Sequence, residues 1–85
     1  MPINRKELIQ KLKKLSYEQF YILLNEAELE DEEKWLLRYA IREDRMVINT
    51  CCKLHISETK YHKTLSLALV KVYYTIKFLY KNGQL

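Results

Sequence analysis

Apolar side chains recur at helical spacing along most of the chain, with polar side chains between them. The pattern is clearest near the C-terminus, where five apolar residues follow one another at intervals of three or four: Leu65, Leu69, Val72, Ile76 and Leu79. Side chains at this spacing lie on one face of an α-helix. One Gly and one Pro in 85 residues leave few turn signals for a sheet. We therefore predict an all-α fold of about five helices in one domain, 1–85, in which residues 1–30 support residues 31–81.

Two helices are predicted in the N-terminal part of the chain, and each begins with a cap. Asn4 followed by Glu7, and Ser16 followed by Gln19, have the spacing of a capping box, in which side chains satisfy the free amides of the first turn. Apolar side chains follow each cap at helical spacing. In the first helix, residues 4–15, they are Leu8, Ile9, Leu12 and Leu15, and in the second, residues 17–28, they are Tyr17, Phe20, Tyr21, Leu24 and Ala27.

A very short turn joins the last two predicted helices. The first of them is short and ends before residue 55, with an apolar face made of Val47, Cys51 and Leu54 and with Ile48 and Thr50 at its edges. Residues 55–57 form the turn, and Ser57 is a preferred N-cap for the last helix, residues 58–81. Two helices joined by about three residues form the helix-turn-helix, whose second helix can enter the major groove of DNA.

The outward face of the last helix begins with a short, polar and partly basic set of side chains. The residues expected to contact DNA there are Ser57, Glu58, Thr59, Lys60, His62, Lys63 and Ser66. Lys and Thr can contact base edges, whereas Ser57 and the amides after it can hold a phosphate. Three residues before the turn are expected to brace the DNA backbone: Arg45, Asn49 and Lys53.

Several of these residues together resemble a known family. The runs EEKWLLRY, VINTCCKLHIS and ETKYHKTLSLALVKV are similar to the DNA-binding region four of bacterial sigma factors and to the small phage and mobile-element regulators that share this fold. The resemblance rests on Leu37-Arg38-Tyr39, Ile56-Ser57, Leu65, Ala68-Leu69 and Lys71. It implies a transcriptional regulator that binds double-stranded DNA, with RNA polymerase as a further partner. The chain departs from the family at His55, where Gly is common, and in a longer loop at 42–45.

The charge is distributed unevenly along the chain. Residues 1–44 carry eight basic and ten acidic side chains, a net charge of −2, whereas residues 45–85 carry seven basic and one acidic, a net charge of +6. Basic charge on the half that holds the helix-turn-helix is the pattern expected for phosphate contact. The alternative is a plain solvated face, which is our interpretation of the basic side of the first helix, including Arg5.

The third helix, predicted at residues 31–41, begins in an acidic run. Six carboxylates lie within residues 26–33. Carboxylates are favourable at a helix N-terminus, so we expect a solvated helix start that faces away from DNA. Trp35 is interpreted as a core anchor, since its neighbours at i+1 and i+4 are apolar. Arg38 and Arg42 lie one turn apart, and either reach phosphates or pair with Glu33 or Glu43.

The residue types that support catalysis or metal binding are scarce. Cys51 and His55 share a helix face, but Cys52 points about 100° away, and zinc motifs need two separated ligand pairs. No third orienting group accompanies a Cys–His pair, as nucleophilic catalysis requires. We therefore predict no metal, no cofactor and no enzymatic activity. No apolar run reaches the roughly 20 residues of a membrane span and the N-terminus lacks the apolar core of a secretory signal, so a cytoplasmic protein is expected.

The last helix carries a second apolar stripe, made of Leu67, Val70, Tyr74 and Phe78. Either the N-terminal helices cover this stripe or a second chain does. A homodimer would suit a reader of two DNA half-sites. An alternative function comes from the same surface: a protein-interaction module that binds a host protein, such as RNA polymerase or a defence component, through Tyr74, Phe78 and Tyr80.

Overall fold

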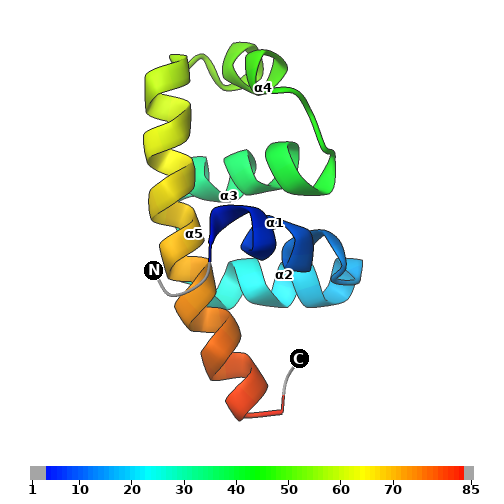
Figure 1. The fold of residues 1–85 in the computed structure, drawn as a ribbon. Coiled ribbons are helices and arrows are strands. Elements are labelled where there is room, and N and C mark those ends of the chain that lie inside the picture. Colours follow the sequence, from blue (N-terminus) through cyan, green and yellow to red (C-terminus); the bar gives the residue numbers. More distant parts are fainter. Residues whose placement is uncertain (1–3, 84–85) are drawn as a thin grey trace.

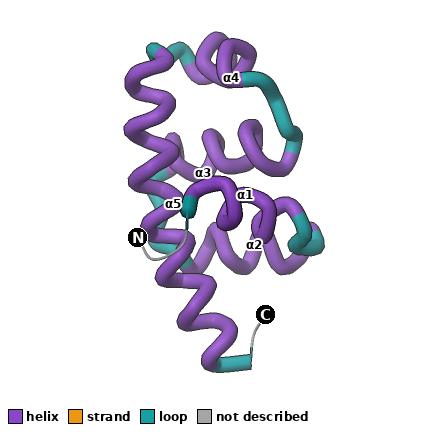
Figure 2. Tube along the Cα trace, in the orientation of Figure 1, coloured by secondary structure: helices purple, strands orange, loops and turns teal. Residues whose placement is uncertain are grey.

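The computed structural model describes residues 4–83, and the described chain consists of helices joined by short turns (Figure 2). The elements in chain order are α1 (Arg5–Lys13), α2 (Tyr17–Glu26), α3 (Asp31–Leu37), the π-helical segment η1 (Arg38–Arg42), α4 (Val47–Leu54) and α5 (Glu58–Lys81). The predicted all-α fold is confirmed, α4 ends at Leu54 as predicted, and α5 has the predicted bounds.

The long helix α5 runs the length of the molecule, and the other helices pack against one side of it (Figure 1). Its predicted inward stripe is confirmed, because Leu65, Leu69, Val72, Ile76 and Leu79 are all buried. From the other helices the core receives Leu8, Leu12, Phe20, Leu23, Leu24, Leu36, Leu37 and Ile41. One face of α5 therefore borders the core along its length, while its opposite face is exposed.

Both predicted N-terminal caps are present. The Asn4 side chain accepts from the Glu7 amide at 2.8 Å. Ser16 and Gln19 form the full capping box, with both bonds at 3.1 Å. Each of the two helices ends two residues earlier than predicted, and the chain after α2 passes through Glu28 at a φ of 51°. A residue with positive φ cannot continue a right-handed helix, which explains the early end of α2.

The third predicted helix changes geometry in its second half. It is α-helical to Leu37 and π-helical from Arg38 to Arg42, where the Glu43 amide donates to the Arg38 carbonyl at 2.9 Å. The prediction that Trp35 anchors the core is wrong, because its side chain is 44% exposed. The buried face is centred on Leu36 and Leu37, and a residue one position earlier points about 100° away from that face.

The acidic start of α3 is only partly solvated, so that prediction is wrong for Glu33. This side chain is 5% exposed. Its Oε1 accepts from the Glu30 amide at 2.9 Å and from Lys71 Nζ at 2.8 Å. Glu33 therefore caps α3 and ties it to the middle of α5.

Alkaline pH should destabilise the fold through Lys71. The hydrogen bond to Glu33 raises the pKa of the Lys71 ammonium, and burial raises the pKa of the Tyr61 phenol. When folding raises the pKa of a group, the folded state holds the proton more tightly than the unfolded state. The resulting stabilisation is complete below the pKa of the unfolded chain, which is near 10 for both groups, and is lost as the pH rises through the pKa of the folded state. We expect the urea midpoint to fall above about pH 10. Lys71→Met should flatten that fall, whereas a Lys77→Met control should retain it; equal slopes in both variants would contradict the assignment.

Thr50 is the one buried side chain of the described residues whose polar atom has no partner. The sequence pattern placed Thr50 at the edge of the apolar face of α4, but it is fully buried and its Oγ1 makes no hydrogen bond. A buried unsatisfied hydroxyl destabilises a fold by about 1–3 kcal/mol. Thr50→Val should therefore raise the free energy of unfolding by about 1 kcal/mol, measured by urea denaturation. Thr50→Ser keeps the hydroxyl and should be less stable than the wild type.

Candidate nucleic-acid interface

The turn between α4 and α5 is left-handed at one residue. His55 has φ 57° and ψ 45°, and the amides of His55 and Ile56 both donate to the Cys51 carbonyl, the second at 3.0 Å. This pairing satisfies the carbonyl end of α4 and reverses the chain within three residues. Glycine adopts positive φ without strain, whereas His55 holds this conformation with a β-carbon.

His55→Gly should stabilise the domain. A left-handed conformation is unfavourable by about 1–2 kcal/mol for a residue with a β-carbon, and glycine gives part of this back through its greater freedom in the unfolded chain. We expect a net gain of about 0.5–1 kcal/mol in the free energy of unfolding, measured by thermal and urea denaturation. His55→Ala retains the strain and should show no gain.

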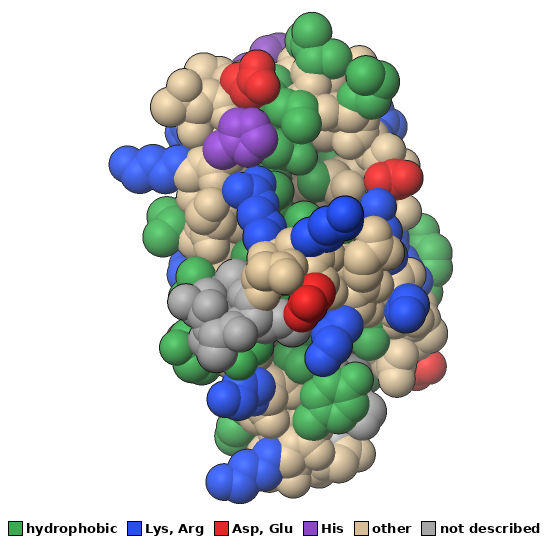
Figure 3. Space-filling model, viewed as in Figure 1, with side chains coloured by type: hydrophobic (Ala, Val, Ile, Leu, Met, Phe, Trp, Pro, Cys, Tyr) green, Lys and Arg blue, Asp and Glu red, His purple; other side chains and the backbone are tan. Residues whose placement is uncertain are grey.

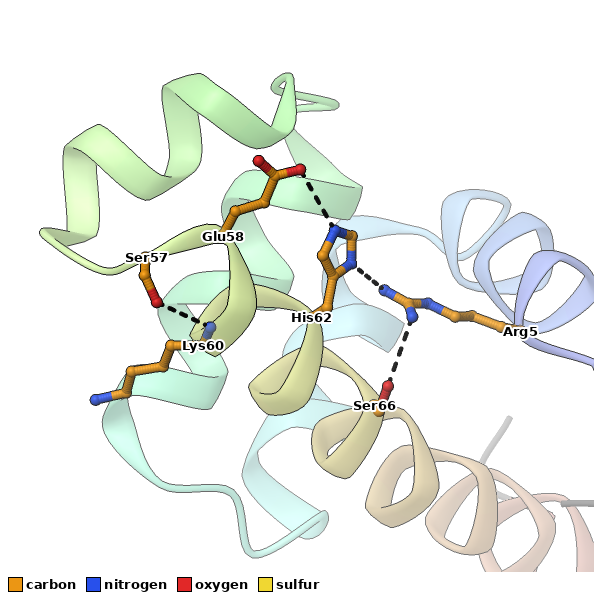
Figure 4. Close-up of polar contacts among 6 residues, drawn as sticks. All are labelled: Arg5, Ser57, Glu58, Lys60, His62 and Ser66. Atoms are coloured by element: carbon orange, nitrogen blue, oxygen red, sulfur yellow. Dashed lines mark hydrogen bonds and ion pairs between the residues drawn. The ribbon is translucent and has the colours of Figure 1, made fainter.

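Ser57 begins α5 as predicted. Its Oγ accepts from the Lys60 amide at 3.1 Å (Figure 4). Thr59, Lys60 and Lys63 are all exposed. Lys60 Nζ lies 3.5 Å from Glu32 Oε2 at the start of α3. The acidic run therefore lies beside the candidate face, and the prediction that it faces away is wrong.

Arg5 joins the candidate face from the N-terminal end of α1. Its guanidinium lies 3.5 Å from Ser66 Oγ and 3.4 Å from His62 Nδ1, and His62 Nε2 lies 3.8 Å from Glu58 Oε1 (Figure 4). The sequence pattern predicts a solvated face for Arg5 and gives no sign of these contacts. Arg5 is separated from its partners by 57 and 61 residues, so no local spacing could reveal the contact.

The three predicted bracing residues have different surroundings. The Arg45 Nε donates to Glu43 at 2.9 Å, and its guanidinium lies over the Tyr39 ring at 5.1 Å. Asn49 and Lys53 are exposed on α4. Arg45 would have to leave an ion pair to reach a phosphate, whereas Asn49 and Lys53 have no side-chain hydrogen bond or ion pair within residues 4–83.

Arg38 and Arg42 pair with neither of the predicted carboxylates. Arg38 donates to the Tyr21 hydroxyl at 3.0 Å and lies 4.7 Å from the Trp35 ring centroid. Arg42 donates to the Leu15 carbonyl at 2.6 Å. Glu33 and Glu43 are instead bound by other cations, Lys71 and Arg45. Arg42 therefore holds η1 against the α1–α2 turn, and Arg38 holds it against α2.

The same arginines line a surface hollow. It has a volume of about 30 Å³ and is lined by Tyr17, Phe20, Tyr21, Arg38, Arg42 and Glu43. A volume of this size holds one or two water molecules.

The cysteines lie on α4, close to the turn. Burial, the nearby Glu58 carboxylate and Cys52 together raise the pKa of the Cys51 thiol. Cys52 is exposed. Among residues 4–83, no group of three or more His, Cys, Asp or Glu side chains is close enough to hold a metal ion.

Basic side chains spread over the face that Figure 3 shows, above α1 and along α5, with few acidic ones between them.

Apolar side chains of the second stripe of α5 remain uncovered: Leu67, Val70, Tyr74 and Phe78 are all exposed. The alternative in which the N-terminal helices cover this stripe is therefore wrong.

No helix within residues 4–83 combines the length and the apolar content needed to cross a membrane.

Comparison of the chain with protein-family models, with curated proteins and with solved structures gives no significant match. The resemblance to sigma region four therefore rests on the residues quoted above, and it remains a prediction.

Proposed function

We propose that this protein is a small sequence-specific DNA-binding regulator that presents the first two turns of α5 to the major groove. The observation that carries the proposal is the exposed N-terminal end of α5, which follows a three-residue turn and is braced by α3 and α4. A helix that enters the major groove reads bases with the residues of its first turns. The proposed type is the sigma region-four-like regulator of a phage or mobile element, acting in the cytoplasm and contacting RNA polymerase.

The exposed side chains divide between two roles. Thr59, Lys60 and Lys63 can reach base edges or phosphates, because they are exposed and only Lys60 is paired. Ser57 and the first amides of α5 suit a phosphate. Asn49 and Lys53 would contact the backbone from α4. We add Arg5 to the predicted set, since its guanidinium lies beside His62 and Ser66.

The acidic neighbours limit how tightly this face can bind. Glu58 belongs to the face, and Glu32 lies within ion-pair distance of Lys60. Binding would require Lys60 to exchange this exposed ion pair for a phosphate, and such a pair contributes only about 0–1 kcal/mol. We therefore expect moderate affinity that decreases steeply with salt.

Selection from a pool of random duplex DNA at two salt concentrations tests the proposal. An enriched motif whose binding weakens strongly with salt supports a sequence-specific regulator. A palindromic motif would indicate binding as a dimer. No enrichment at either salt concentration contradicts the proposal.

The second candidate function is a protein-interaction module built on the helix-turn-helix fold. The uncovered stripe of α5 favours it, because large exposed apolar patches mark interaction sites. The two functions differ in salt dependence. An apolar and aromatic interface should respond weakly to salt, whereas phosphate contacts respond strongly.

A further inference from the structure

The uncovered stripe of α5 has the shape of a helix-binding surface. Its four side chains are 41–60% exposed. Val70, Tyr74 and Phe78 are spaced four residues apart, so they form a straight ridge of the kind that packs into the groove of another helix. Tyr74 and Phe78 are each 60% exposed and together offer on the order of 200 Å². With Leu67 and Val70 the patch reaches the size that marks interaction sites on monomers.

Lysines border this stripe, and acidic residues are missing from it. Lys63 and Lys81 are about five helical turns apart and therefore lie in line with the stripe, one at each end. Lys77 lies beside it, with its ammonium 5.5 Å from the Tyr73 ring centroid. Glu58 is the last acidic residue of α5. The two ends of the stripe therefore carry positive charge, whereas beside its middle Lys71 is bound to Glu33 of α3, with Glu30 and Glu28 nearby.

This charge pattern disfavours a second copy of the chain as the occupant. In a parallel pair of α5 helices, each lysine would lie beside its own counterpart. In an antiparallel pair centred between Val70 and Tyr74, Lys63 of one copy would lie opposite Lys81 of the other. Like charges placed against each other weaken an interface in either orientation. The homodimer expected from the sequence is thus a poor match for this stripe.

We propose that the stripe binds an acidic amphipathic helix of another protein. The apolar side chains of that helix cover Leu67, Val70, Tyr74 and Phe78, and its carboxylates meet Lys63 at one end and Lys77 and Lys81 at the other. The positive charge at the two ends of the stripe selects the partner, while the apolar ridge supplies most of the binding area. This inference goes beyond DNA binding and stands without it, because it rests on residues that, apart from Lys63, lie outside the proposed DNA face.

A selection among displayed helical peptides tests the inference, with the full chain as bait. The peptides carry leucine at four positions with the spacing of the stripe, and Glu, Gln or Lys at random in the bordering positions. We expect Glu to be enriched at least ~10-fold over Lys at those positions. Enrichment of Lys, or no enrichment of any peptide, overturns the proposal.

Variants of the chain locate the binding surface. Tyr74→Ser combined with Phe78→Ser should weaken binding of the selected peptide by at least ~20-fold, because buried aromatic anchors dominate interfaces. Tyr80→Ser is the matched control: the sequence grouped Tyr80 with Tyr74 and Phe78, but Tyr80, 58% exposed, lies about 160° around the helix from Phe78 and off the stripe. It should change affinity by less than about twofold. Equal losses in both variants would place the contact elsewhere and overturn the inference.

A charge reversal separates the acidic partner from other occupants. Lys77→Glu with Lys81→Glu should move the selection from Glu-bordered to Lys-bordered peptides. A concentration-dependent dimer that Phe78→Ser dissociates would identify a second copy as the occupant and overturn the proposal. If no peptide were enriched, and the chain instead bound vesicles that contain anionic phospholipid and lost that binding in Phe78→Ser, the proposal would be overturned in favour of a membrane surface. Unchanged helical circular dichroism in every variant shows that the fold is retained.

Discussion

Reversing the charge of Lys60 and Lys63 together should abolish DNA binding while the domain remains folded. Both side chains are exposed on the outward face at the start of α5. Each would neutralise a phosphate or contact a base edge, and a glutamate in its place would repel the backbone. We expect affinity for the selected duplex to fall at least ~100-fold, measured by fluorescence anisotropy. Unchanged affinity in the folded variant would contradict the proposed function.

A matched variant separates local contact from total charge. Lys77→Glu with Lys81→Glu alters the net charge by the same amount on the same helix, but outside the candidate face. It should lower DNA affinity by no more than about fivefold through the general field. The milder Lys60→Gln with Lys63→Gln should also reduce the slope of log affinity against log salt by about 2, because two phosphate contacts are lost.

Replacing Phe20 by alanine should cause the largest loss of stability. Phe20 is 1% exposed in the core. Arg42 lies over its ring, 5.3 Å from the centroid, while donating to the Leu15 carbonyl. Truncation of a buried phenylalanine destabilises a protein by about 3–5 kcal/mol. A domain of 85 residues has a total stability on the order of 4–13 kcal/mol, so Phe20→Ala should lower the melting temperature by at least ~12 °C.

Two controls show whether the loss comes from the cavity. Phe20→Leu keeps most of the volume and should be destabilised by only ~1 kcal/mol. Tyr17→Ala removes the exposed ring that also faces Arg42, at 4.7 Å, and should be destabilised by about 1 kcal/mol or less. If Tyr17→Ala were as destabilised as Phe20→Ala, the loss in Phe20→Ala would come mainly from the contact with Arg42 rather than from core packing.

Local rules were sufficient for much of this fold. The caps at Asn4, Ser16 and Ser57 lie where a short polar side chain precedes an apolar pattern. Each of these side chains accepts a hydrogen bond from the amide three residues later, as expected. The inward stripe of α5 was predictable because 24 residues of helix repeat the period many times.

The errors arise where a local pattern is short or a contact is distant. The seven residues of α3 span about two turns, so the apolar pattern did not fix its rotation, and Trp35 was placed inward. The π-helical segment that follows depends on hydrogen bonds five residues apart, for which the sequence carries no spacing signal. The contacts of Arg5 and Glu33 join residues 38–61 positions apart and depend on the packing of whole helices.

The unbroken course of α5 has a geometric consequence. From Lys63 to Phe78 the helix rises about 22 Å without a hinge, and both ends of this span are fixed by the same core. With DNA at the proposed face, a protein docked on the ridge would thus be held at a constant rotation about the axis of the DNA. The side of the DNA on which the docked protein lies would therefore depend on the position of the binding site along the turns of the double helix.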